Sequence, residues 1–112
     1  MKQVAKKSKI KVNIIQSIDR KIPLEDIASA NNISMDELVK ELEAIVFSGT
    51  KVDIDYYIDE NIDEYAREDI EEYFMNADTD SVDVAFKELQ EDDISIDEIQ
   101  IVRIKFLSDN AN

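Results

Sequence analysis

The chain contains no cysteine and no histidine. Without cysteine it can form neither disulfides nor thiolate metal sites, which fits a reducing compartment. Without histidine it lacks the most common general base at neutral pH, so Ser-His-Asp and Cys-His catalytic systems are excluded. The single glycine, Gly49, cannot build a GxxxxGKS/T or GxGxxG phosphate loop. We therefore expect no catalytic residue, no metal site and no cofactor within these 112 residues.

Turn-forming residues are scarce too, since Gly49 is joined by only one proline, Pro23. All-β sandwiches and barrels need many tight turns, which this composition does not supply. Apolar residues make up 44% of the chain and occur throughout it, so wholesale disorder is not expected. The sequence predicts an all-α fold, a small bundle of about six helices with helix-turn-helix, winged-helix-like units.

Long apolar runs are missing as well. No stretch of about 18 apolar residues occurs, although a membrane-spanning helix needs one. Residues 1–11 also lack the apolar core of a secretion signal. We expect a soluble, cytoplasmic protein with no membrane partner, and its oligomeric state stays open.

The amino-terminal part has the pattern of a helix-turn-helix. A first helix is expected from about Ser8 to Arg20, because isoleucines recur at helical spacing. These are Ile10, Ile14 and Ile18. The pattern indicates a basic lead-in or linker over residues 1–7 and a single helical domain over residues 8–112, with the helix-turn-helix in residues 8–50.

Two further helices complete that unit. Pro23 disfavours helix before it, so a second helix is expected at Leu24–Ala30. Ser34 and Glu37 form a capping box that predicts the start of a third helix, and Gly49 can adopt the left-handed conformation that ends it. After this helix, Val52, Ile54 and Tyr56 alternate with polar residues. The alternation suggests a short extended segment over residues 52–57, a rudimentary wing.

The carboxy-terminal part predicts helical hairpins over residues 59–109. Apolar residues mark a fourth helix near Ile62 to Phe74 and a fifth at Val82–Leu89. A last helix follows the capping box of Ser95 and Glu98. Its broad apolar arc indicates that it is central to the core or covers a partner. The segment Ser108–Asn112 is expected to be frayed.

The words ISMDEL and ISIDEI begin at Ile33 and Ile94. They indicate either two related helical hairpins or the common resemblance between helix starts, because few kinds of cap exist. Between them, three aspartates resemble a calcium loop: Asp78, Asp80 and Asp83. The glycine and the glutamate that an EF-hand needs later in the loop are absent, so these residues are expected to cap the next helix.

Charge is distributed unevenly along the chain, whose net charge is -14. Residues 1–22 carry seven cations against one anion, a net charge of +6. Residues 23–57 carry two cations against eight carboxylates, and residues 58–112 carry four against 18. Only the amino-terminal end can attract a polyanion.

The third helix, Met35 to Phe47, is the one that would enter a DNA groove. It carries four carboxylates against Lys40 alone, a net charge of -3. Counterion release needs lysines or arginines at the phosphates, so repulsion should dominate. We expect this helix to serve as scaffold or as a protein contact. The candidate docking residues are Asp36, Glu37, Glu41 and Glu43.

Cations near the amino terminus remain as candidates for contact with nucleic acid. They are Lys6, Lys7, Lys9, Lys11, Arg20 and Lys21. An ordinary solvated basic face that balances an acidic body explains the same pattern.

Longer phrases carry a family resemblance. They are KSKIKVNIIQSIDRKIPLEDIA, MDELVKELEAIVFSGTKVDIDYYIDE, TDSVDVAFKEL and EIQIVRIKFLSD. Together they resemble the carboxy-terminal helix-turn-helix extension of RecQ-type ATP-dependent DNA helicases, in the form found among Bacteroidetes-like bacteria. The resemblance covers residues from about Lys7 to Asn112.

The resemblance implies a bacterial parent protein, nucleoid-associated, that unwinds duplex DNA in the 3' to 5' direction during repair and recombination. ATP, magnesium and zinc would belong to that parent alone. This chain would be its non-catalytic accessory part, with the rest of the helicase as partner, acting by protein docking or weak DNA contact. The alternatives are an acidic protein-interaction module that does not touch nucleic acid and a free-standing helix-turn-helix regulator.

Overall fold

Helices account for all the regular structure in the described part of the chain, so the predicted all-α class is confirmed. The computed structural model describes the backbone of residues 2–110 and the side chains of residues 9–110. Within this part, seven α-helices and one 3-10 turn occur and no strand is present. The α-helices are α1 (Lys2–Asp19), α2 (Leu24–Ala30), α3 (Met35–Phe47), α4 (Asp55–Asn61), α5 (Glu64–Asn76), α6 (Val82–Leu89) and α7 (Ile96–Asn110), with η1 (Gln90–Asp92) between the last two.

The helix-turn-helix is formed by α1, α2 and α3, and α1 begins at Lys2 rather than near Ser8. At its other end, Lys21 takes a left-handed conformation with φ of 60°. The Ile22 N–H then donates to the Ser17 carbonyl at 3.0 Å. This hydrogen bond and the left-handed residue end α1 before Pro23, which confirms the helix end predicted from the proline.

Both ends of α3 confirm their sequence signals. The Ser34 hydroxyl accepts a hydrogen bond from the Glu37 N–H at 3.1 Å, and the Glu37 carboxylate accepts one from the Ser34 N–H at 3.0 Å. Gly49 has a φ of 98°, and the Thr50 N–H after it donates to the Ile45 carbonyl at 3.2 Å. The helix therefore has a full capping box and a left-handed stop.

The predicted extended segment over residues 52–57 is wrong, because α4 begins at Asp55. No neighbouring strand exists in the described chain to pair with such a segment, so there is no wing. The Asp53 carboxylate instead accepts a hydrogen bond from the Asp55 N–H at 3.1 Å, which supports the helix start. Ile54 and Ile58 are fully buried and lie at helical spacing, so burial favours a helix here.

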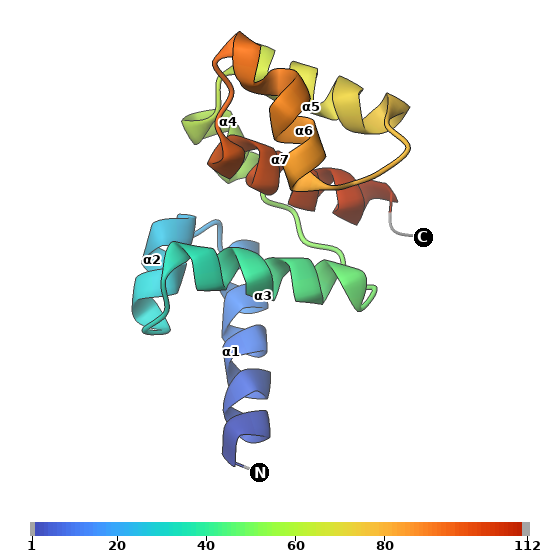
Figure 1. Ribbon diagram of the computed structural model, residues 1–112. Helices are drawn as coiled ribbons and strands as arrows, with labels where there is room; N and C mark the ends of the chain where they lie inside the picture. Colours follow the sequence, from blue (N-terminus) through green and yellow to red (C-terminus); the bar gives the residue numbers. More distant parts are fainter. Residues whose placement is uncertain (1, 111–112) are drawn as a thin grey trace.

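The last helix, α7, is central to the carboxy-terminal part, as its broad apolar arc predicted. Both α5 and α6 pack against it, and Figure 1 shows it along the side of that part that faces α3. Ser108 lies on α7 and is only 1% exposed, so the expectation of a frayed end from Ser108 is wrong at this residue. Its hydroxyl donates to the Val52 carbonyl at 3.0 Å and accepts from the Val52 N–H at 2.9 Å.

The two parts of the chain meet where α3 packs against α7. These two helices begin within the two similar words, and Ser95 with Glu98 repeats the capping box at the start of α7. The buried apolar side chains of both parts belong to one continuous cluster. Each helix therefore buries part of the other's surface, and this arrangement positions the surfaces described next.

Candidate nucleic-acid interface and docking surface

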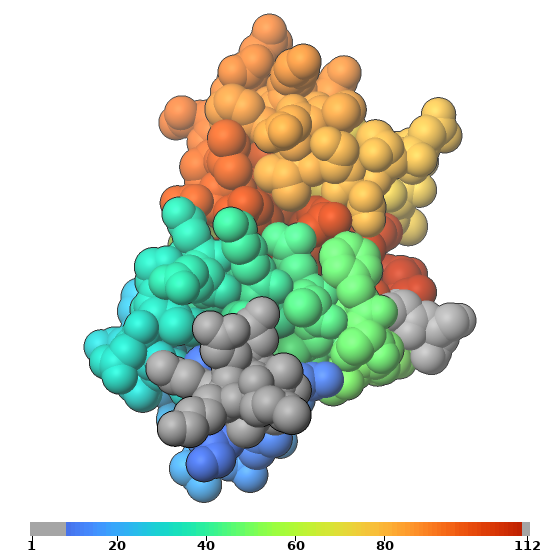
Figure 2. Space-filling view, turned by 60° about the horizontal axis from the view of Figure 1, so that its bottom comes forward, coloured from blue at the N-terminus to red at the C-terminus, as the bar shows by residue number. Residues whose placement is uncertain are grey.

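The helix that would read DNA, α3, is held between two neighbours. It packs against α2 and against α7, and Figure 1 shows it between the amino-terminal helices and the carboxy-terminal part. In Figure 2 its residues form a band along the boundary of the two parts. The exposed residues left on it are Asp36, Glu37, Lys40, Ala44 and Phe47. A face with one cation and two carboxylates offers little to a phosphate backbone.

The four predicted docking residues on α3 differ in their surroundings. Asp36 and Glu37 are exposed, and Glu41 is half-buried. Glu43 pairs with Arg103 of α7, with 3.2 Å between the Glu43 Oε2 and the Arg103 Nη1. Glu43 therefore holds the two parts of the chain together, while the other three are open to a partner.

Arg103 is the most buried cation among the described side chains, at 7% exposure. Its Nε donates to the Asp80 carbonyl at 2.6 Å, and its Nη2 lies 3.4 Å from the Asp80 carboxylate. Its guanidinium carbon is 5.7 Å from the centre of the Phe47 ring. The expected capping role of Asp78, Asp80 and Asp83 is wrong, because the hydroxyl of Ser81 caps α6 instead.

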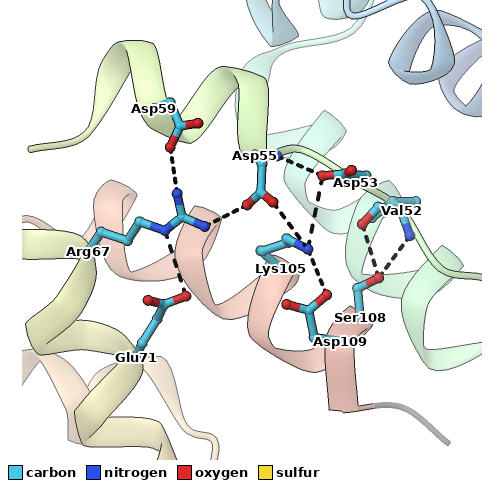
Figure 3. A network of polar contacts seen from close by, with 9 residues as sticks. All are labelled: Val52, Asp53, Asp55, Asp59, Arg67, Glu71, Lys105, Ser108 and Asp109. Carbon is cyan, nitrogen blue, oxygen red and sulfur yellow. Dashed lines mark hydrogen bonds and ion pairs between the residues drawn. The ribbon is translucent and has the colours of Figure 1, made fainter. Parts of the chain in front are cut away.

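Two more cations are neutralised in the network of Figure 3. Arg67 lies 2.6 Å from both Asp55 and Asp59 and 3.7 Å from Glu71. Its charge is thus shared among three carboxylates, so it is not available for an external anion. Burial alone would lower the pKa of Arg67, but the carboxylates raise it above its ordinary value.

Lys105 forms the second centre of that network. Its Nζ lies 2.6 Å from Asp109, 3.5 Å from Asp55 and 4.0 Å from Asp53. Burial alone would lower the pKa of Lys105, but these carboxylates raise it. Lys105 and the buried Ser108 lie on one side of α7 and together hold the segment that links α3 to α4.

The cations predicted to contact nucleic acid lie in α1 or directly after it. Lys9, Arg20 and Lys21 are exposed and Lys11 is half-buried. Among the side chains of residues 9–110, none of these four has a carboxylate oxygen within 4.0 Å. The side chains of Lys6 and Lys7 lie outside the described residues. The amino-terminal turns of α1 point away from the rest of the molecule in Figure 1.

Two tyrosines at the start of α4 tie this helix to the helix-turn-helix. The Tyr56 hydroxyl donates to the Ile22 carbonyl at 2.5 Å, and the Tyr57 hydroxyl donates to the Glu25 carboxylate. Burial, together with the charge of Asp53, raises the pKa of Tyr56 to about 12. Burial and the bond to Glu25 raise the pKa of Tyr57. Both phenols therefore stay protonated and serve as hydrogen-bond donors.

Sequence reasoning missed Arg67, Arg103 and Lys105 as structural cations. A signal for two of them was present, since VRIK places Arg103 and Lys105 inside an apolar stretch of helix. Cations in such a stretch are rarely buried without a paired carboxylate. Most of their partners could not be identified, because only Asp109 lies on the same helix, and Glu43, Asp80, Asp53 and Asp55 are distant in the sequence.

Two features are absent from the described residues. No group of three or more carboxylates there is arranged to hold a metal ion. None of the described helices is both long and apolar enough to cross a membrane.

The family model of the RecQ-1-like helix-turn-helix domain matches residues 8–58. This range contains most of α1, all of α2 and α3, and the start of α4. No curated protein matches the chain. Residues 8–58 are therefore similar to the helix-turn-helix domain of RecQ-type proteins, while the wider resemblance up to Asn112 stays a prediction.

Proposed function

We propose that this chain is a non-catalytic accessory domain of a RecQ-type ATP-dependent DNA helicase, which unwinds duplex DNA in the 3' to 5' direction in repair and recombination. The observation that carries the proposal is the match of residues 8–58 to the RecQ-1-like helix-turn-helix domain. The chain would contribute binding energy and no chemistry, and ATP hydrolysis would belong to the parent helicase.

Docking on a basic protein surface is the role that the charges favour. Residues 23–112 carry 26 of the 27 carboxylates against six cations. Of those six, Arg67, Arg103 and Lys105 are already paired within the molecule. Complementary charge speeds association and fixes orientation. A surface that binds a helicase's own basic residues would also compete with DNA for them.

Direct contact with DNA, where it occurs, would use α1. Its described cations, Lys9 and Lys11, have no carboxylate partner among the side chains of residues 9–110, whereas α3 presents only Lys40. Four to six phosphate contacts would give a slope of about -4 to -5 in a plot of log affinity against log salt. Such binding would be weak at physiological salt. A free-standing regulator that reads DNA through α3 is disfavoured, because α7 covers part of that helix.

The test is an unwinding assay with a RecQ-type helicase that lacks this domain. Adding the chain in trans at low salt should change the unwinding rate or the affinity for a forked duplex. Replacing Asp36 by Asn and Glu41 by Gln should weaken that effect. The matched control replaces Glu88 and Glu91 by Gln, which removes the same charge from exposed positions on α6 and η1. Absence of any effect of the unaltered chain would contradict the proposal.

A further inference from the structure

A small cleft opens where the first turns of α3 and α7 meet α2 and α4. Its volume is about 240 Å³, below the range of about 300 to 1,000 Å³ that is typical of pockets for drug-sized ligands. Its floor is apolar, formed by Met35, Val39 and Ile101. Val39 and Ile101 are only 6% and 7% exposed, so the floor is fixed by the core. The cleft is therefore large enough to receive one side chain.

The rim of the cleft carries three carboxylates, those of Glu25, Asp36 and Asp97. All three residues are exposed, and none has a lysine or arginine nitrogen within 4.0 Å among the described side chains. The two nearby helix starts each contribute about half a positive charge, which offsets about one carboxylate of the three. The rim therefore stays negative.

Tyr57 fixes one of these carboxylates in place. Its ring lines the cleft at 6% exposure, and its hydroxyl donates to the Glu25 carboxylate. Gln100 adds an amide to the same wall. The cleft thus combines an apolar floor with an acidic rim, and one carboxylate of that rim is held in position by Tyr57.

We propose that this cleft receives a lysine or arginine side chain from a basic segment of a partner protein. The methylene stem would lie on Met35, Val39 and Ile101, and the charged head would lie among the rim carboxylates. The proposal rests on the docking role proposed above and names its site.

Other hollows fit this occupant less well. Those beside Arg67 and beside Lys21 already contain a cation of the chain itself. A third, between α5 and the α6–η1 segment, has carboxylates at Asp69, Glu72 and Asp92 but is a shallow, open surface. The cleft at α3 and α7 alone among these four encloses an apolar floor beneath unpaired carboxylates.

The experiment is an NMR titration of the isotope-labelled chain at low salt, with acetylated, amidated tetralysine as the probe. The amide signals of Met35, Val39 and Ile101 should move together as tetralysine is added. Contacts should be detected between lysine methylene protons and the methyl groups of Val39 and Ile101. Acetylated, amidated tetraglutamate should move none of these signals.

Two double variants separate the cleft from general attraction to an acidic protein. Asp36→Asn with Asp97→Asn should weaken tetralysine binding about three- to tenfold, the range expected for two partly exposed ion pairs. The matched control is Asp69→Asn with Asp92→Asn, which removes the same charge elsewhere and should leave the affinity within about twofold. Thermal melts of both variants establish that they are folded.

Three results would overturn the proposal. Equal weakening in both double variants would mean diffuse electrostatic attraction. Shifts spread over the acidic surface, without methylene contacts to Val39 or Ile101, would mean that no side chain enters the cleft. Broadening of the cleft signals with protein concentration alone would assign the cleft to α1 of a second copy. The titration contains no helicase, so its outcome is independent of the unwinding assay.

Discussion

The hydroxyl of Ser108 occupies a buried contact between α7 and the segment that follows α3. It is bonded to both the N–H and the carbonyl of Val52, and Val52 itself is 5% exposed. Backbone groups in such a place must find partners inside the protein, because water does not reach them. One side chain therefore satisfies two backbone groups that come from the other part of the chain.

Replacing Ser108 by alanine should lower the free energy of unfolding by about 1–3 kcal/mol, because it leaves buried backbone groups without partners. Urea unfolding followed by circular dichroism measures the change. Ser29→Ala is the matched control, since Ser29 is exposed on α2. Equal stability of the two variants would show that the contact at Val52 contributes nothing.

The phenol of Tyr56 makes stability depend on pH at the alkaline end. Its pKa in the folded chain is about 12 against an ordinary value of 10.0, raised by burial and by Asp53. The folded state then binds more protons than the unfolded state between these values. This contribution is complete below about pH 10 and is lost as the pH rises towards 12. The raised pKa of Lys105 acts in the same direction.

Tyr56→Phe should therefore flatten the alkaline decline in stability. The variant should be somewhat less stable than the original chain at neutral pH, because it loses the hydrogen bond to the Ile22 carbonyl. Its loss of stability above about pH 10 should be smaller. Urea melts at a series of pH values measure the slope, with Tyr65→Phe as an exposed control. An unaltered slope in Tyr56→Phe is the result that would contradict this account.

At the scale of elements, the contact between α3 and α7 depends on Arg103. Its guanidinium joins Glu43 of α3 to Asp80, just before α6, and lies against Phe47. The planar fork of arginine suits this divided set of acceptors better than the point charge of lysine. Arg103 therefore stabilises the covered arrangement of α3.

Arg103→Ala should lower the free energy of unfolding by about 1–3 kcal/mol, because it removes the ion pairs and hydrogen bonds of a nearly buried guanidinium. The partly exposed carboxylates that Arg103 contacts can be hydrated in the variant, which limits the loss. Arg103→Lys should fall between that variant and the original chain. Lys87→Ala, on the exposed face of α6, should change stability by no more than about 0.5 kcal/mol. Chemical unfolding of the three variants gives the ranking. A loss of unfolding free energy in Arg103→Ala no larger than that in Lys87→Ala would show that Arg103 does not stabilise the contact between α3 and α7.

The elements that could be predicted from the sequence are those with local signals. The third helix has three local signals in its sequence. Its capping box and Gly49 determine its two ends, and its apolar period determines the face that is buried. The segment 52–57 could not be predicted correctly, because a short alternation fits a strand as well as a helix start. Tertiary burial of Ile54 and Ile58 decides for the helix.

The candidate surfaces could be predicted only in part. The charge of each segment is a property of the sequence, and it predicts that α3 binds DNA poorly. Which cations are neutralised depends on packing, since Arg103 pairs with Glu43 across α3 and α7. The cleft was not visible either, because Glu25, Met35 and Asp97 come together only when these helices pack.

At the scale of the whole molecule, charge of the two signs is separated. Among the side chains of residues 9–110, Lys9 and Lys11 of α1 have no carboxylate oxygen within 4.0 Å. In contrast, three of the four cations in residues 58–112 are paired with carboxylates. The acidic surface is therefore not balanced by the cations within it. We expect a polyanion to be attracted only by residues 1–22, and a basic protein surface to be attracted by the acidic remainder of the chain.

We expect that this chain cannot hold a nucleic-acid backbone through α3, which carries a net charge of -3. Fluorescence anisotropy with forked and single-stranded DNA, measured from low to physiological salt, tests it most directly. We expect binding only at low salt, lost when Lys6, Lys7, Lys9 and Lys11 are replaced by Gln, and unchanged when Lys40, Lys51 and Lys87 are replaced by Gln. Firm binding at physiological salt that disappears with Lys40→Gln would contradict the account.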